Sequence, residues 1–131
     1  MSIEFNIGVD KKWFLGDDKI LSFTIFGSDG ITPIDFSSWQ IEFVARKKTK
    51  PTSDLAFPIK SVSNGGLNLT GTYNADPLVN TQRLIVPVSS LETTSLKAGW
   101  PYRYSIKRTD STNEEVLVYG SITFLQAPGT P

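Results

Sequence analysis

The sequence predicts an all-β protein folded as an antiparallel sandwich of seven to eight strands. Short segments with alternating apolar and polar residues recur along the chain, and this period of two is typical of strands that bury one face. Turn-forming residues separate these segments at intervals of about ten residues, and no long segment has a helical period. The expected strands span residues 3–8, 19–26, 40–47, 56–62, 67–72, 82–88, 102–107 and 115–124.

The first half of the chain contains the two strands with the clearest alternation. The residues expected to face the core are Leu21, Phe23 and Ile25 in one strand and Ile41, Phe43 and Ala45 in the other. The strand at residues 3–8 precedes them and is read as an edge strand. Because Pro58 has no N–H to donate to a neighbouring strand, residues 56–62 are also expected at a sheet edge.

The second half continues with a strand that alternates and then with a short helix. The residues that share one face of this strand are Leu84, Val86 and Val88. Residues 89–97 are expected to form one or two helical turns, because Ser89 or Ser90 can cap them and Glu92 lies in the first turn. Gly120 interrupts the last strand, which predicts a β-bulge or a close backbone approach there.

A turn with glycine and proline leads into the strand at residues 102–107. Leu96, Gly99 and Tyr102 follow one another at a spacing of three residues. This spacing is typical of a tyrosine corner, in which the tyrosine hydroxyl bonds back to the backbone upstream. Together with the strand count, the corner predicts an immunoglobulin-like β-sandwich, with a small barrel as the alternative fold.

Length and composition limit the classes of function. The chain has 131 residues, and we assign residues 1–126 to a single domain and residues 127–131 to an extended C-terminal tail. It has no cysteine and no histidine, which excludes disulfides, thiolate metal sites and pairs of a nucleophile with an imidazole. The formal net charge is zero, and no apolar run approaches the length of a membrane span. We therefore expect no catalysis, no cofactor, no metal, and neither nucleic acid nor membrane as a partner.

Acidic pairs are the remaining source of catalytic chemistry. Asp17-Asp18 and Glu114-Glu115 are adjacent in sequence, and neighbours on a strand point to opposite faces. Neither pair is therefore expected to work as the acid and base of a hydrolase. Asp29-Gly30 is typical of a turn rather than of a calcium loop, and the basic run at residues 47–50 is typical of a solvated loop.

Three bulky residues in a row, Trp13, Phe14 and Leu15, cannot all face one core from a strand. One interpretation is a strand whose residues pack on both of its faces. The other is a contact with a partner, since exposed apolar clusters mark protein interfaces. We predict Trp13, Phe14 and Leu15 as interface residues, together with the terminal segments.

Two stretches of the chain, within residues 16–43 and 91–124, combine turns, alternating strands and the leucine, glycine and tyrosine of the corner. This pattern resembles small immunoglobulin-like domains of tailed bacteriophage virions. That family includes the N-terminal domains of baseplate upper proteins and short head, neck or tail accessory proteins. In those domains a Gly-Asp turn precedes an alternating strand, a connector with proline ends in tryptophan, and a corner with leucine, glycine and tyrosine comes late. The corresponding stretches here are residues 16–18, 21–25, 29–30 and 33–43 in the first half and residues 91–99, 102–106 and 120–124 in the second.

The resemblance implies a non-enzymatic structural protein of the virion, made in the cytoplasm of the bacterial host. Its expected partners are other virion proteins of the capsid, neck, tail or baseplate, with capsid decoration among the expected roles. Self-association into a homo-oligomer is left open. The alternative function is a carbohydrate- or host-surface-binding module that stacks sugar rings on Trp39, Tyr73 or Trp100.

Overall fold

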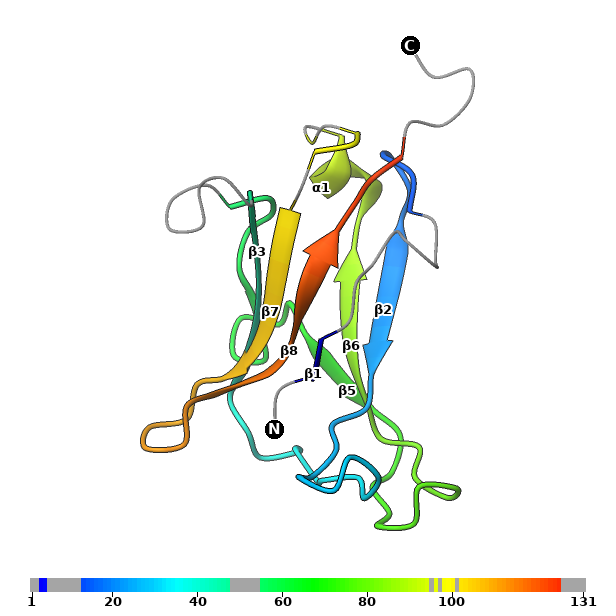
Figure 1. Ribbon diagram of the computed structural model, residues 1–131, viewed down its shortest axis with the longest axis vertical. Helices are drawn as coiled ribbons and strands as arrows, with labels where there is room; N and C mark the ends of the chain where they lie inside the picture. Colours follow the sequence, from blue (N-terminus) through cyan, green and yellow to red (C-terminus); the bar gives the residue numbers. More distant parts are fainter. Residues whose placement is uncertain are drawn as a thin grey trace.

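The structure is a computed structural model, and it describes residues 3–4, 13–47, 55–94, 96, 98–100 and 102–125. These residues form eight strands and one short helix (Figure 1). The strands are β1 (Ile3–Glu4), β2 (Lys19–Phe23), β3 (Ile41–Lys47), β4 (Lys60–Ser61), β5 (Asn68–Thr70), β6 (Arg83–Val88), β7 (Tyr102–Arg108) and β8 (Glu115–Ile122). The helix, α1 (Ser90–Thr93), connects β6 to β7.

The strands form two sheets that face each other (Figure 1). One sheet has the strand order β1-β8-β7-β3-β4, and the other has the order β2-β6-β5. All neighbouring strands are antiparallel except β1 and β8, which pair in parallel. The chain crosses between the sheets after β1, β2, β4 and β6. The predicted all-β sandwich is therefore confirmed.

Alternation places the predicted core residues between the two sheets. In β3, β6 and β7 every second side chain is buried, and the residues between them are half-buried or exposed. The buried side chains of these strands are Ile41, Phe43, Ala45, Leu84, Val86, Val88, Tyr102, Tyr104 and Ile106. One continuous hydrophobic core joins both sheets, which explains why a chain without disulfides can hold this fold.

The bulge in the last strand lies at Leu117 rather than at Gly120. Ile106 of β7 pairs with Val118, and Lys107 pairs with Val116, so Leu117 is the extra residue. Gly120 pairs in regular register with Tyr104, so the predicted bulge at that position is wrong. A bulge turns two successive side chains toward one face, and Leu117 and Val118 are accordingly both buried.

The edge strand next to β3 is shorter than expected. Strand β4 covers two residues of the predicted segment 56–62, and it lies at the end of its sheet. Upstream, the Ala56 N–H donates to the Ala45 carbonyl at 2.7 Å, and Phe57 then turns into the core. Pro58 follows directly, so the segment leaves β3 and rejoins it at β4. Of the first predicted strand, Ile3–Glu4 is confirmed, and the rest lies outside the described residues, as does the tail at 127–131.

Candidate functional site

Trp13 lies inside the core and not on the surface. Its side chain is 0% exposed, and its ring meets that of Phe124 edge-on at 4.9 Å between centroids and stacks on Phe57 at 6.5 Å. The prediction that Trp13 contacts a partner is therefore wrong. The physical reason is that the segment joins the sheet with the indole directed inward, where it fills space next to Phe57 and Phe124.

Phe14 and Leu15 are half-buried, and their backbone extends the sheet. Phe14 forms a parallel bridge with Leu125, just beyond β8. The Leu125 N–H donates to the Trp13 carbonyl, and the Leu15 N–H donates to the Leu125 carbonyl, each at 2.9 Å. The triplet therefore forms an isolated bridge rather than a strand, with Trp13 in the core and Leu15 packed against it. Phe14 and Leu15 as partner contacts stay a prediction.

A turn at Gly99 precedes β7, at the place where the tyrosine corner is predicted. Gly99 has a positive φ of 76°, which favours glycine, and its N–H donates to the Phe124 carbonyl at 3.0 Å. Leu96 packs against the core, and Tyr102 is buried at the start of β7. The three residues thus occupy the places that a tyrosine corner requires, while the hydrogen bond from the Tyr102 hydroxyl stays a prediction.

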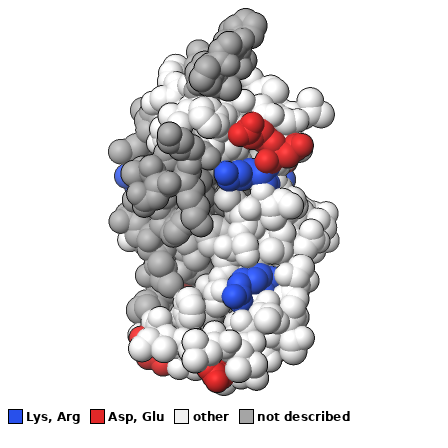
Figure 2. Space-filling model, turned by 90° about the vertical axis from the view of Figure 1, so that its right-hand side faces the viewer, with Lys and Arg blue, Asp and Glu red and all other residues white. Residues whose placement is uncertain are grey.

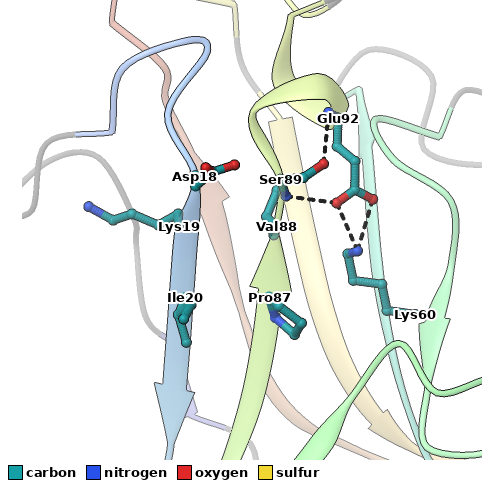
Figure 3. Close-up of a pocket in the computed structure, with 8 residues that line it drawn as sticks. All are labelled: Asp18, Lys19, Ile20, Lys60, Pro87, Val88, Ser89 and Glu92. Atoms are coloured by element: carbon teal, nitrogen blue, oxygen red, sulfur yellow. Dashed lines mark hydrogen bonds and ion pairs between the residues drawn. The ribbon is translucent and has the colours of Figure 1, made fainter.

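A hollow of about 430 Å³ opens beside α1, where the two sheets come together (Figure 3). Its floor is apolar: Ile20 of β2 and Pro87 of β6 lie side by side on neighbouring strands, and Val88 follows. Its upper rim carries the side chains of Lys60 and Glu92. The hollow is open and shallow. Of the two carboxylates that line it, Asp18 accepts from the Ser90 N–H and Glu92 binds Lys60.

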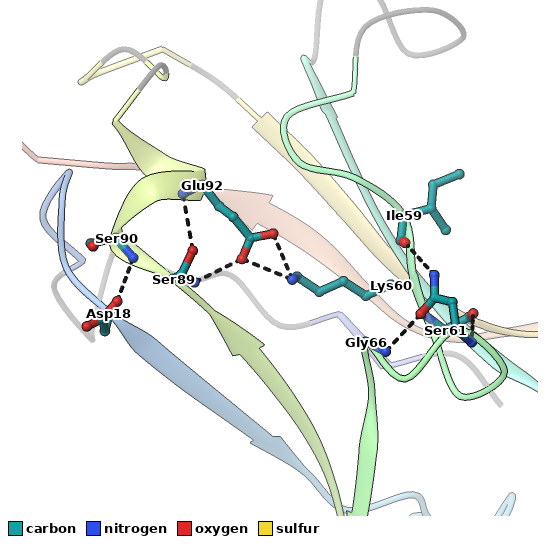
Figure 4. A network of polar contacts seen from close by, with 9 residues as sticks. Asp18, Ile59, Lys60, Ser61, Gly66, Ser89, Ser90 and Glu92 are labelled. Carbon is teal, nitrogen blue, oxygen red and sulfur yellow. Dashed lines mark hydrogen bonds and ion pairs between the residues drawn. The ribbon is translucent and has the colours of Figure 1, made fainter.

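The ion pair in this hollow joins β4 of the larger sheet to α1. Lys60 Nζ on β4 donates to both carboxylate oxygens of Glu92 on α1, at 3.0 and 2.8 Å, and the two side chains are 11% and 21% exposed. The Ser89 N–H also donates to Glu92 at 2.9 Å, while the Ser89 hydroxyl accepts from the Glu92 N–H. Of the two predicted caps, Ser89 is the one that the structure shows, and with Glu92 it forms a capping box (Figure 4).

Asp18 completes the polar network around α1. Its carboxylate accepts from the Ser90 N–H at 2.6 Å (Figure 4). The Thr93 hydroxyl accepts from the Gly16 N–H at 2.9 Å. Burial acts to raise the pKa of Glu92, but the hydrogen bonds from Lys60 and Ser89 outweigh it and hold that pKa below its usual value. All these polar groups serve to attach α1 to both sheets, which is a structural role.

Glu92→Gln should reveal this role through its pH dependence. At pH 7 we expect the free energy of unfolding to fall by about 1–2 kcal/mol, because the ion pair is lost and Lys60 keeps its charge without a counter-ion, although glutamine can still accept from the Ser89 N–H. The folded pKa of Glu92 lies below its unfolded value near 4.5, so this stabilisation is complete above 4.5 and is lost as the pH falls through the folded pKa. Urea unfolding at pH 7 and pH 3 should therefore show a smaller difference between variant and wild type at pH 3.

The matched control is Glu114→Gln, which neutralises an exposed carboxylate in the loop between β7 and β8. It should change the unfolding free energy little at either pH. If Glu92→Gln costs as much at pH 3 as at pH 7, the Glu92 carboxylate does not stabilise the fold by its charge.

The aromatic residues considered for sugar stacking do not form one platform. Trp39 lies beneath the Arg108 guanidinium, 4.0 Å from its ring centroid, whereas the Lys47 ammonium lies 5.3 Å from the Trp100 ring. Arg108 and Lys47 mark opposite ends of the β3–β7 ladder, on the order of 20 Å apart by strand geometry. The Tyr73 hydroxyl donates to the backbone at 2.9 Å. A stacking site would therefore rest on one ring at a time.

The loop between β5 and β6 displays two apolar side chains that sequence reasoning missed. Leu78 is 94% exposed and Val79 is 56% exposed. Hydrogen bonds fix this loop: Asp76 accepts from the N–H groups of Leu78, Val79 and Asn80, at 2.9 to 3.0 Å. The signal in the sequence is the Asn-x-Asp-Pro run at residues 74–77, which is typical of side-chain-capped turns.

The described part of the surface seen in Figure 2 is mainly uncharged, with acidic atoms at its lower edge. This view faces the right-hand side of Figure 1, on which β2 lies. Acidic and basic atoms lie together in one band toward its upper end, and a separate basic patch lies lower down. A surface with so little charge suits contacts with apolar side chains better than contacts with a polyanion.

The described residues contain no group of three or more acidic, histidine or cysteine side chains that could hold a metal ion. No helix among them reaches the length and apolar character of a membrane span. A scan against protein-family models finds no match, and a search of curated proteins finds no relative.

Proposed function

We propose that this chain is a non-enzymatic structural protein of a tailed bacteriophage virion that assembles with capsid, neck or tail proteins through protein–protein contacts. The sequence resemblance to immunoglobulin-like virion domains is the first support. The second is the strand order, because β2-β6-β5 facing β8-β7-β3-β4 corresponds to strands B-E-D facing G-F-C-C′ of an immunoglobulin sandwich.

The observation that carries the proposal is the rigid loop with Leu78 and Val79 at its surface. A fully exposed leucine next to an exposed valine, on a loop already fixed by hydrogen bonds, is costly to leave in water and loses little entropy on binding. Apolar burial contributes about 25 cal/mol per Å². A modest contact per copy therefore becomes strong when many copies bind a repeating lattice.

The experiment that tests this function is light scattering on the purified protein, alone and mixed with virions assembled without it. We expect saturable uptake by the particles. A protein that stays monomeric and ignores the particles would contradict the proposal, and a glycan screen monitored by tryptophan fluorescence would then test the alternative.

Leu78→Asp should weaken uptake by at least about tenfold, because a charge replaces the apolar anchor. Leu91→Asp is the matched control, since Leu91 is a similarly exposed leucine on α1, away from this loop. Its uptake should stay close to that of the wild type. Equal losses in both variants would mean that the loop is not the contact.

The alternative, a carbohydrate- or host-surface-binding module, depends on single rings. Trp100, 43% exposed, is the ring that a sugar could reach. This alternative predicts that a glycan quenches the tryptophan fluorescence of the wild-type protein, and that the quenching is absent in Trp100→Ala.

A further inference from the structure

Two arginines stand directly opposite each other on the outer face of the larger sheet. Arg46 of β3 pairs with Arg103 of β7, and their neighbours Ala45 and Tyr104 face the core, so both guanidinium groups belong to the outer face. Directly opposed residues of antiparallel strands have Cβ atoms about 5 Å apart, and like charges at this distance destabilise the pair.

Within the part of the chain that the structure describes, neither guanidinium has an ion pair or a hydrogen bond to offset this repulsion. Three other cationic side chains each lie near an acidic residue. Lys60 binds Glu92, Arg108 binds Asp110 at 2.7 Å, and Lys107 stands opposite Glu42 in the same ladder. The arginine pair is thus a local excess of two positive charges in a chain whose formal net charge is zero.

The surface is hollowed at this pair. A depression of about 200 Å³ is lined by Val44, Arg46, Arg103, Tyr104 and Ser105. Val44 and Ser105 are themselves opposite each other, two residue pairs further along the ladder and therefore on the same face. The depression therefore combines two guanidinium groups, one hydroxyl and a small apolar wall, which suits an oxyanion carried on a short aliphatic stem.

We propose that Arg46 and Arg103 form a clamp for a carboxylate, the side chain of an aspartate or glutamate on an acidic segment of a protein partner. Guanidinium groups bind carboxylates through paired N–H···O bonds, and two of them match one or two carboxylates in charge. A nucleic acid would call for a wider positive field than two arginines in a neutral chain. The identification of the partner as a protein rests on the proposed function, while the clamp itself does not.

The test uses the isolated protein and a capped hexaglutamate peptide as the probe, at low ionic strength, followed by amide NMR. We expect saturable shifts centred on Arg46, Arg103 and Ser105. Arg46→Gln and Arg103→Gln should each raise the dissociation constant of the peptide about tenfold, and Arg103→Lys should raise it less, since lysine keeps the charge but not the fork.

The matched control is Lys107→Gln, which removes the same charge from the same face of the same strand. It should leave the dissociation constant within about twofold of the wild-type value. Equal weakening by Lys107→Gln and Arg103→Gln would overturn the clamp, because binding would then follow net charge alone. Stronger binding of inorganic phosphate than of the peptide would overturn the choice of a carboxylate.

The amide spectra also show that each variant is folded, so a loss of binding cannot be mistaken for unfolding. Virion uptake is not part of this measurement. A negative result would therefore count against the clamp and leave the uptake of the wild-type protein by virions as the separate test of function.

Discussion

Trp13→Ala is expected to lower the free energy of unfolding by about 3–5 kcal/mol, the usual cost of removing a fully buried large aromatic side chain. Trp13 is 0% exposed and contacts the rings of Phe57 and Phe124, so its loss leaves a large cavity between the sheets. Urea unfolding followed by far-ultraviolet circular dichroism would measure the change. A domain of this size is stable by about 5–15 kcal/mol, so the variant is expected to be only marginally folded.

Trp100→Ala is the control, because Trp100 lies largely at the surface before β7. Its removal should cost less than about 1 kcal/mol. If Trp13→Ala were as mild as Trp100→Ala, the indole would have to leave the core in solution. The prediction of Trp13 as a partner contact would then return.

The direction of the Trp13 side chain could not be predicted from the sequence. A run of three bulky residues indicates that they cannot all face one core, but it does not indicate which one faces inward. That choice is made by the backbone pairing with Leu125, which lies more than a hundred residues away in the chain. Periodicity reports one strand at a time, and it carries no information about which distant segment will pair with it.

The regular strands were predictable because the periodicity of a strand is a local property of the sequence. In β3 and β6 every second residue from Ile41 to Ala45 and from Leu84 to Val88 is apolar and buried, so the register that buries this set is favoured, and the sandwich follows from having several such strands. The capping box at Ser89 was also predictable, because its residues are three apart in the chain. The bulge at Leu117 was not predictable, since a glycine inside a strand is the usual local indication of a bulge and the glycine of this strand is Gly120.

The candidate binding features all depend on contacts between distant residues. Lys60 lies on β4 and Glu92 on α1, 32 residues apart in the chain, and Arg46 and Arg103 become opposed only through the β3–β7 register. Exposure of Leu78 depends on hydrogen bonds that hold its loop away from the core. A leucine in a loop with proline is equally able to turn inward, so composition alone did not favour it as a contact.

Gly71→Ala is expected to lower the free energy of unfolding by about 3 kcal/mol. Gly71 has a φ of +78°, which costs an alanine about 1–2 kcal/mol, and a Cβ there would lie 2.0 Å from the Thr81 carbonyl oxygen. The backbone at Thr81 must therefore move to make room for the Cβ. Overpacking of this kind adds about 1–3 kcal/mol to the loss of stability. Urea unfolding would measure the total.

Gly65→Ala separates these two causes. Gly65 has the same φ of +78°, but a Cβ there would meet nothing within 4 Å, so this variant carries the conformational cost alone. The difference between the two variants measures the close approach to Thr81. Equal losses of unfolding free energy in the two variants would mean that the backbone at Gly71 moves to accept the Cβ at no further cost.

The same pair of variants connects stability to function. Gly71 begins the loop that carries Leu78, and Thr72 and Thr81 close that loop by a backbone hydrogen bond of 3.1 Å. Displacing Thr81 would change the direction in which Leu78 points, so Gly71→Ala should weaken virion uptake at temperatures where the protein is still folded. Gly65→Ala should not. Unchanged uptake with a displaced loop would mean that Leu78 is not held in a fixed position for its partner.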